Sequence, residues 1–322
     1  MQQSEFAWLV LRAGLAPSVH NIQPARWRLQ GDGALLAADL SVGLGHGDPL
    51  GLDAGLSCGA ALEAMVIALS DKGLAAHTTD LWAENDCHKV PSHRIAAHIR
   101  WSDGGMPDVL SGSLDTRFTH RGTFADGPVP PFDRGDAVLL TDPKDKAWLA
   151  ARHDWAGLQI MRDAAFRAEL LGWMRFNRSH PRYAHDGLGR DAIRLSAFTA
   201  LAAKFALGPL WPLLDRLGLT PALTAEAAAT QSAQVLACFH RPIDESPVTS
   251  GRAYLRMCLE ATQHRMAGWP MAALSDHPLT RAEVCARYNI GPDRRLVQVI
   301  RFGLPGADPP PRARRPVAEV LL

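Results

Sequence analysis

The sequence lacks several features that mark specialised proteins. Its 322 residues contain five scattered cysteines and no C-x-x-C pair, so neither a zinc ribbon nor a thioredoxin-like redox site is supported. No H-E-x-x-H motif occurs and no G-x-S-x-G nucleophile turn stands out, so the sequence gives no indication of hydrolase chemistry. Basic and acidic residues balance at 34 and 33, so the chain as a whole has no charge suited to nucleic acid or another polyanion. The balance leaves room for one local cationic pocket.

Long uninterrupted apolar runs are missing too. The most apolar stretch, residues 195–214, is broken by Lys204, Gly208 and two prolines, whereas a membrane span needs about 20 mostly apolar residues. The first five residues lack the basic and apolar regions of a signal peptide. We therefore expect a cytoplasmic protein with buried, reduced thiols and with no membrane or nucleic-acid partner.

What the sequence does contain is the pattern of an α+β protein with two related halves. Hydrophobic residues make up 47% of the chain, enough for a sizeable core. Two apolar helices are predicted at 53–72 and 250–266, each followed after a gap by a strand-like run, at 94–101 and 296–302. Further strands are predicted at 27–29, 35–38, 137–140 and 234–239. This order indicates a diverged duplication with a boundary near 103–105, and hence domains at 1–105 and 106–322.

The second half carries two additional segments. Residues 147–233 form a helical, insertion-like region, which is either a lid over a site or extra packing, and packing is the simpler interpretation. Residues 304–316 are rich in proline and arginine and cannot form a regular helix. We expect this C-terminal segment to be an extended arm that lies on the surface or on the other half.

Two patterns that suggest ligands are better explained as structure. The glycine-rich segment 43–48 matches neither known phosphate-loop pattern and reads as a turn before the helix at Asp53. His88, His93 and His98 recur every five residues, a spacing that puts them on one face of neither a helix nor a strand. No metal site is predicted.

Three other segments are more informative. Residues 16–24 place hydroxyl and amide side chains between two prolines, a set able to hydrogen-bond a planar heterocycle, although a helix-ending turn has the same composition. In the segment 117–121, Arg117, Thr119 and Arg121 alternate, so on extended backbone they point to one side and suit a phosphate dianion. A second arginine cluster, 312–315, precedes a proline. The alternative for both arginine segments is a solvated charged surface.

Together these segments resemble the nitroreductase-like FMN oxidoreductases, and most closely their Acg-like subgroup of fused, two-half proteins. The resemblance runs from about residue 11 to 321. Segments 173–176 and 186–188 resemble the Acg-like subgroup specifically. The resemblance implies a nitroreductase-like fold in which the halves form an intramolecular pseudo-dimer, each with a central mixed or antiparallel sheet flanked by helices. It also implies a monomer or a weak homodimer.

The resemblance further implies one FMN per chain, held between the halves. The serine–asparagine–glutamine loop occurs only in the first half and the arginine segment only in the second, so a second flavin site is expected to be lost. The family often has a Pro-x-Glu-Gly segment beside the reactive nitrogen of the flavin. In this chain residues 269–273 stand at that place, so the resemblance implies a backbone contact to the flavin there and no glutamate side chain. The implied cofactor-binding residues are Pro17, Ser18, His20, Asn21, Gln23, Arg117, Thr119, Arg121, Pro270, Met271, Ala272, Arg312, Arg314 and Arg315.

The implied activity is ping-pong hydride transfer through flavin N5, from NAD(P)H to a nitroaromatic, quinone or similar small electrophile. Arg121 is the candidate stabiliser of the flavin anion, and no other catalytic side chain is required. The alternative is an FMN-sequestering protein whose helical insertion covers the flavin and prevents turnover. A third interpretation is an oxidase or dehydrogenase that acts on a biosynthetic intermediate.

Overall fold

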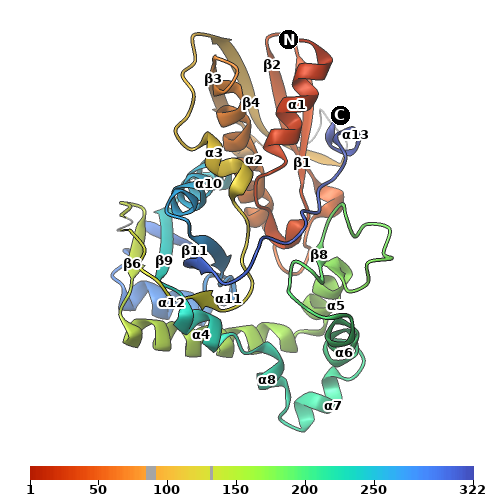
Figure 1. Ribbon diagram of the computed structural model, residues 1–322, viewed down its shortest axis with the longest axis vertical. Helices are drawn as coiled ribbons and strands as arrows, with labels where there is room; N and C mark the ends of the chain where they lie inside the picture. The colour runs from red at the N-terminus through yellow and green to blue at the C-terminus, as the bar shows by residue number, and fades with distance from the viewer. Residues whose placement is uncertain (85–91, 131–132) are drawn as a thin grey trace.

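The computed structural model describes residues 1–84, 92–130 and 133–322. One of the five cysteines, Cys87, and one of the three regularly spaced histidines, His88, lie outside the described residues. The first half contains a four-stranded antiparallel sheet in the order β1-β2-β4-β3. Its strands are β1 (Ala25–Gln30), β2 (Gly33–Asp39), β3 (Leu74–Asp80) and β4 (His93–Asp103). Helices α1 (Gln3–Ala13) and α2 (Leu52–Ser70) pack beside it, in the upper part of Figure 1.

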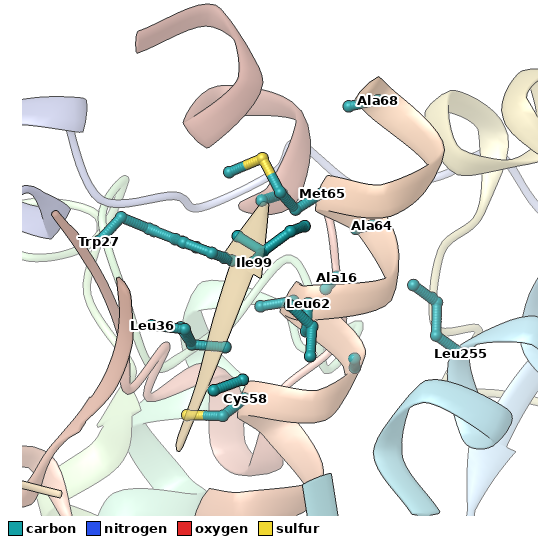
Figure 2. Close-up of a cluster of buried hydrophobic side chains, with 14 of the residues drawn as sticks. Ala16, Trp27, Leu36, Cys58, Leu62, Ala64, Met65, Ala68, Ile99 and Leu255 are labelled. Atoms are coloured by element: carbon teal, nitrogen blue, oxygen red, sulfur yellow. The ribbon is translucent and has the colours of Figure 1, made fainter. Parts of the chain in front are cut away.

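Helix α2 is the central element of the first core. It is apolar around most of its circumference, as expected of a helix with neighbours on every side. Figure 2 shows Trp27, Leu36 and Ile99 of the sheet on one side of α2 and Leu255 on the other. Among the described helices only α2 is long and apolar enough to cross a membrane, and 78% of its most apolar part is buried inside the protein.

The second half is built on a second antiparallel sheet, in the order β10-β11-β9-β6, with β5 paired to the end of β11. Its strands are β5 (Phe124–Ala125), β6 (Ala137–Leu140), β9 (Val235–Pro242), β10 (Ala267–Pro270) and β11 (Arg294–Pro305). Side chains alternate along β9: Val235 and Ala237 face α10 (Pro247–Gln263), while Leu236 and Cys238 face the opposite core. That opposite core is covered by α4 (Pro143–Arg162), α11 (Ala273–Asp276) and α12 (Pro278–Arg287).

The two halves meet where α2 packs on α10, and glycine makes this contact possible. A Cβ atom at Gly59 would lie 2.0 Å from the carbonyl oxygen of Val248, and one at Gly251 would lie 2.1 Å from that of Leu56. Both distances are far below van der Waals contact, so any larger residue would push the helices apart.

The helical region of the second half has two parts. Helix α4 and the short α9 (Ala227–Ser232) pack on each other and on the second core. Between them the chain projects away from both sheets, at the lower right of Figure 1. This projecting part contains α5 (Ala164–Trp173), β7 (Met174–Arg175), β8 (Leu188–Gly189), α6 (Ala197–Leu207), α7 (Trp211–Arg216) and α8 (Thr220–Thr224).

The C-terminal segment crosses back to the first half. After β11 it runs without regular helix to α13 (Val317–Val320), and Figure 1 shows it ending beside α1. Leu321 pairs with Trp27 of β1, and the Leu322 N–H donates to the Trp27 carbonyl at 2.8 Å. The predicted extended arm is confirmed.

The predicted helices and strands occur with ends shifted by a few residues, and the described structure adds five strands: β3, β10 and the two-residue strands β5, β7 and β8. Strand β3 escapes a pattern search because its sequence, LAAHTTD, is mostly half-exposed and has no clear apolar alternation. Strand β10 is short and contains Gly268 and Pro270, which both disfavour a strand assignment.

Candidate active site

A cavity of about 300 Å³ lies between the two halves. The first half contributes the loop at 17–20 and the start of α2, and the second contributes the segment 117–121, α10, β10 and β11. This volume is at the lower end of the range for small-molecule sites, and the position between two sheets is typical of them.

The loop after α1 is held in an unusual backbone conformation. His20, Asn21 and Gln23 have positive φ angles of 43°, 57° and 51°, in a region that costs energy for residues other than glycine. The Ser18 hydroxyl accepts a hydrogen bond from the Gln23 N–H at 3.0 Å and closes the loop. Such strain persists only where surrounding contacts enforce it, and it is common at functional sites.

Asn21 and Gln23 supply those contacts. The Asn21 amide donates to the carbonyls of Gly187 and Ala313, each at 3.2 Å, and its oxygen accepts from Arg314. The Gln23 amide donates to the His185 carbonyl at 2.8 Å, and its oxygen accepts from the Arg315 N–H at 3.0 Å. The two amides therefore bind the loop to the projecting helical part and to the C-terminal arm.

The segment 117–121 is extended and lies alongside β10. Thr119 forms an isolated bridge with Gly268, and the His120 N–H donates to the Gly268 carbonyl at 3.1 Å. Arg117, Thr119 and Arg121 all line the cavity, while His120 points away and is buried against the Thr123 carbonyl. Phe118 lines the cavity as well, so of the two intervening residues only His120 points to the other side.

Two of these arginines are poorly satisfied. The Arg117 guanidinium donates to the Leu15 carbonyl at 3.2 Å and its Nε has no partner. Among the described residues, Arg121 has no hydrogen bond or ion pair at all. Burial lowers the pKa of Arg117, and it lowers the pKa of Arg121 to about 10, because little nearby offsets the loss of water.

Two arginines of the C-terminal arm join them. A recess of about 190 Å³ adjoins the cavity and is lined by Arg117, Arg312, Arg314 and Asn21. Arg314 donates to the carbonyls of Gly14 and Leu15 at the end of α1, and Arg312 donates to that of Arg117. Burial, followed by repulsion from Arg117 and Arg312, lowers the pKa of Arg314 to about 9.

The arm's third arginine has a different environment. Arg315 forms an ion pair with Asp186 at 2.8 Å, and Asp186 is also bound by Arg175 and Arg182 at 2.9 and 2.7 Å. Burial alone would raise the pKa of Asp186, but the hydrogen bonds from Arg182 and Arg175 outweigh it and the pKa is lowered. Arg315 thus fixes the arm in place.

The structure brings most of the predicted residues together and leaves three outside the cavity wall. Pro17, Ser18, His20, Asn21, Arg117, Thr119, Arg121, Pro270, Ala272, Arg312 and Arg314 line the cavity or the recess. Gln23 and Arg315 lie behind the wall, in the contacts just described. Met271 is fully buried in the second core, and its N–H donates to the Val299 carbonyl at 2.7 Å.

Several residues that line the cavity were not predicted. Asp53 and Ser57 lie one turn apart at the start of α2, and Tyr254 and Cys258 have the same spacing on α10. Polar side chains spaced by four residues on an otherwise apolar helix are a signal that could have identified Asp53 and Ser57. Tyr254 and Cys258 carry no comparable signal, because both are common in cores.

The segments 173–176 and 186–188 form a small unit near the recess. Strands β7 and β8 pair in parallel, and the Arg175–Asp186 ion pair joins the two segments. Gly187 has a φ of 76°, and a Cβ atom there would lie 2.4 Å from the Trp173 carbonyl oxygen. Glycine is therefore required at this position.

Fold and site define an α+β protein with a cationic ligand cavity between two antiparallel sheets. No protein-family model matches the chain. Over 132 residues it is 31% identical to two Mycobacterium tuberculosis proteins, from strains CDC 1551 and H37Rv, provisionally named NAD(P)H nitroreductases. These alignments cover 39% of this chain and 35% of each relative, so the matched region spans about a third of the relatives' length.

One solved structure with a weaker likeness is described as the FMN and NADPH-dependent nitroreductase NfnB from Sphigopyxis sp. strain HMH. It is 18% identical, with a TM-score of 0.33, over 62% of this chain and 89% of that chain. This likeness is too distant to define the fold. The sequence matches confirm the resemblance to nitroreductases, and the Acg-like subgroup stays a prediction.

Proposed function

We propose that this protein is an FMN-dependent NAD(P)H oxidoreductase that reduces nitroaromatics, quinones or similar small electrophiles. The observation that carries the proposal is the set of arginines around the cavity. Arg117, Arg121, Arg312 and Arg314 converge there from distant parts of the chain, and none has a carboxylate within ion-pair distance among the described residues. Arg117 is buried, Arg121 and Arg314 are half-buried and Arg312 is exposed. Cations withdrawn from water without a counter-charge are costly, so an anionic ligand is the natural completion of this site. The similarity to named NAD(P)H nitroreductases supports the same function.

The residues present fit FMN. Arg117, Arg312 and Arg314 would surround its phosphate, because guanidinium groups match phosphate oxygens in geometry and charge. Ser18, Thr119 and the backbone at Pro270 and Ala272 would hold the ring system in the 300 Å³ cavity. When bound, FMN supplies hydride transfer between NAD(P)H and the second substrate.

The chain itself contributes electrostatics. Arg121 lines the cavity, the recess and a neighbouring chamber, so its charge acts at the point where all three meet. A fixed cation in a site with little water stabilises negative charge that develops during the reaction. His20 lines the cavity as well, and burial, followed by repulsion from Arg121, lowers its pKa to about 4, so it stays neutral and bears no charge that would oppose Arg121.

The two halves would form a pseudo-dimer with one FMN. The first half, 1–105, supplies the strained loop, and the second half, 106–322, supplies the segment 117–121 and the arm. Each half has an antiparallel sheet and one buried helix, and α2 packs on α10 between them. The alternative, an FMN-sequestering protein, requires the helical part to block access. The chamber of about 920 Å³ beneath that part favours turnover instead.

The decisive experiment is an absorption spectrum of the purified protein, followed by release and quantification of its flavin. One FMN per chain supports the proposal, and NAD(P)H oxidation that depends on an added quinone separates the enzyme from the sequestering protein. Two FMN per chain would refute the pseudo-dimer, and a protein that takes up no added FMN would refute both functions.

The matched variants are Arg117→Ala and Arg100→Ala. Arg117 is buried in the cavity wall and Arg100 is an exposed arginine on β4. Loss of Arg117 is expected to weaken FMN binding by on the order of 2–5 kcal/mol, because a buried phosphate loses a charged donor. Arg100→Ala is expected to bind FMN as the parent does. Equal FMN affinity in the two variants would place the phosphate elsewhere.

A further inference from the structure

A second, larger chamber opens from the cavity. It has a volume of about 920 Å³ and shares His20, Asp53, Arg121, Glu226 and Trp269 with the cavity wall. A molecule in this chamber would therefore reach the cavity without crossing bulk solvent. The chamber lies between the core of the protein and the projecting helical part seen in Figure 1.

The outer walls of the chamber are apolar. They come from α4, α5, α6 and α8, with Ile160, Phe166, Leu170, Ala203 and Leu223 among the side chains that face it. On α6 the chamber is lined by three alanines, Ala202, Ala203 and Ala206, together with Thr199 and Leu207. The bulky Phe198 of the same helix is 82% exposed to solvent. The small residues leave the space open, which is the arrangement of a binding chamber rather than of a packed core.

The inner end of the chamber is polar and acidic. Asp53 and Asp276 face it, and neither forms an ion pair among the described residues. Burial, followed by repulsion from other carboxylates, raises the pKa of Asp276 to about 7 and that of Asp53 well above its usual value. The raised pKa favours the protonated form of both groups relative to an ordinary aspartate, and a protonated carboxyl can donate a hydrogen bond.

The other charged groups at this end already have partners or belong to the cavity. Glu226 is paired with Arg301, which stacks on Trp269 at 3.9 Å. Arg194 donates to the Asp308 carbonyl at 3.1 Å. His153 lies 3.7 Å from Asp154 and 3.8 Å from Glu226. Apart from Arg121 and Arg194, no titratable side chain facing the chamber offers a cation without a carboxylate partner within the described part of the chain, so the apolar walls between α4, α5 and α6 offer an anion no counter-charge.

We propose that this chamber binds a neutral, largely apolar small molecule whose hydrogen-bond acceptor points towards Asp53 and Asp276. A quinone with a hydrocarbon tail has this chemistry: the carbonyl accepts a hydrogen bond and the tail fills the space between α4, α5 and α6. The role of this molecule as the electron acceptor of the reaction rests on the proposed function. Its binding in the chamber does not.

Binding is tested without turnover. The purified chain is titrated with Nile red, a neutral apolar dye, and with 8-anilinonaphthalene-1-sulfonate, an anionic one. With excess FMN present to occupy the arginine-lined cavity, the chamber is expected to bind Nile red at least about tenfold more tightly than the anionic dye, because the apolar walls between α4, α5 and α6 offer the sulfonate no partner. Equal affinities would overturn the proposal, and this result would leave the FMN site untouched.

Two variants on one helix locate the dye. Ala206→Trp fills the chamber and is expected to weaken Nile red binding at least about tenfold, since bulk replaces the binding space. Phe198→Ala removes an exposed apolar side chain and is expected to leave binding unchanged. The opposite pattern would place the dye on the outer surface and overturn the proposal. Should Ala206→Trp misfold by circular dichroism, Ala203→Phe narrows the same chamber and decides the question in the same way.

The role as substrate is tested with two quinones, unsubstituted benzoquinone and a decyl-substituted benzoquinone. Ala206→Trp is expected to raise KM for the decyl compound at least about tenfold and to change kcat/KM for benzoquinone less than about threefold. Equal effects on both quinones would overturn the assignment of the tail to the chamber. Loss of all quinone reduction in the parent would instead refute the proposed function, and the dye result would stand.

Discussion

The interface between α2 and α10 and the arginine-lined cavity lie next to each other, and they are built by opposite rules. At the interface the buried charge is paired: Glu63 of α2 binds Arg252 and Arg256 of α10 at 2.7 and 2.9 Å, and Arg256 also binds Asp108 at 2.8 Å. In the cavity wall Arg121 has no partner among the described residues, and Arg117 has one carbonyl contact. Both regions are built from distant segments of the chain.

The difference in charge pairing distinguishes a region that maintains the fold from a region that binds a ligand. An interface that is packed through glycines and has its charges paired is complete without a ligand, so changing it should affect folding. A cavity wall with unpaired cations is incomplete, so changing it should affect binding and leave folding intact or improve it. The predictions below test this contrast, from the largest expected effect to the smallest.

The largest effect is expected at the helix contact. Gly59→Ala is expected to destabilise the protein by on the order of 3 kcal/mol or more, because the added Cβ would lie 2.0 Å from the Val248 carbonyl oxygen and α10 must move. Gly112→Ala in α3 (Ser111–Thr116) is the control, since nothing lies within 4 Å of its added Cβ. Urea unfolding measures both. Similar stabilities for the two variants would mean that α2 and α10 do not need this close approach.

The next effect is expected at the paired charge of the same interface. Glu63 is 3% exposed, so Glu63→Gln leaves Arg252 and Arg256 facing a neutral amide. The expected cost is about 2 kcal/mol, below the value for a fully buried pair because both arginines are about one-third exposed. Chemical unfolding at low and high salt checks this cost. An unfolding free energy equal to that of the parent at both salt concentrations would contradict the prediction.

How much of this contrast the sequence predicts depends on how far apart in the sequence the contacting residues lie. Alternation within 117–121 is local, so the common side of Arg117, Thr119 and Arg121 follows from the sequence. The separate environments of Arg314 and Arg315 do not follow, because they depend on Asp186 and on α1, each more than 100 residues away. The pairing of Glu63 with α10 is equally long-range.

The same limit applies to the fold. The composition of the α2 segment identifies a core helix, and the prolines of the C-terminal segment exclude a helix there. No local pattern shows that Met271 points into the second core while Pro270 and Ala272 line the cavity. Nor does any local pattern bring Asp53 and Asp276 to one chamber, because they are more than 200 residues apart in the sequence.

A smaller effect of opposite sign is expected in the cavity. Arg121→Met is expected to stabilise the flavin-free protein by about 1 kcal/mol, a value reduced for water in the cavity, because the pKa of Arg121 is lowered to about 10 and its charge opposes folding. The folded state releases this proton before the unfolded state does, so flavin-free stability should rise as the pH passes 10 in the parent and not in the variant.

The readouts for Arg121→Met are thermal unfolding of the flavin-free protein and FMN affinity, measured beside exposed Arg100→Met. The variant should unfold at a higher temperature and bind FMN more weakly, and the control should change neither. A variant that unfolds at a lower temperature than the parent would show that Arg121 is structural, which would remove the distinction between the two regions.

The smallest effect concerns the chamber carboxyls and their dependence on pH. The pKa of Asp276 is raised to about 7 by burial and then by repulsion from Asp48, so the folded state holds its proton at pH values where the unfolded state has released it. Stability of the parent should therefore fall as the pH rises from about 4 to about 7, by less than about 1 kcal/mol because water in the chamber screens the charge.

Asp276→Asn should remove this fall, and Leu279→Ala, which changes an exposed side chain of α12, should retain it. Urea unfolding at several pH values between 4.5 and 7.5 distinguishes these outcomes. An equally steep fall in Asp276→Asn would assign the titration to another group and leave Asp276 as an ordinary solvated carboxylate.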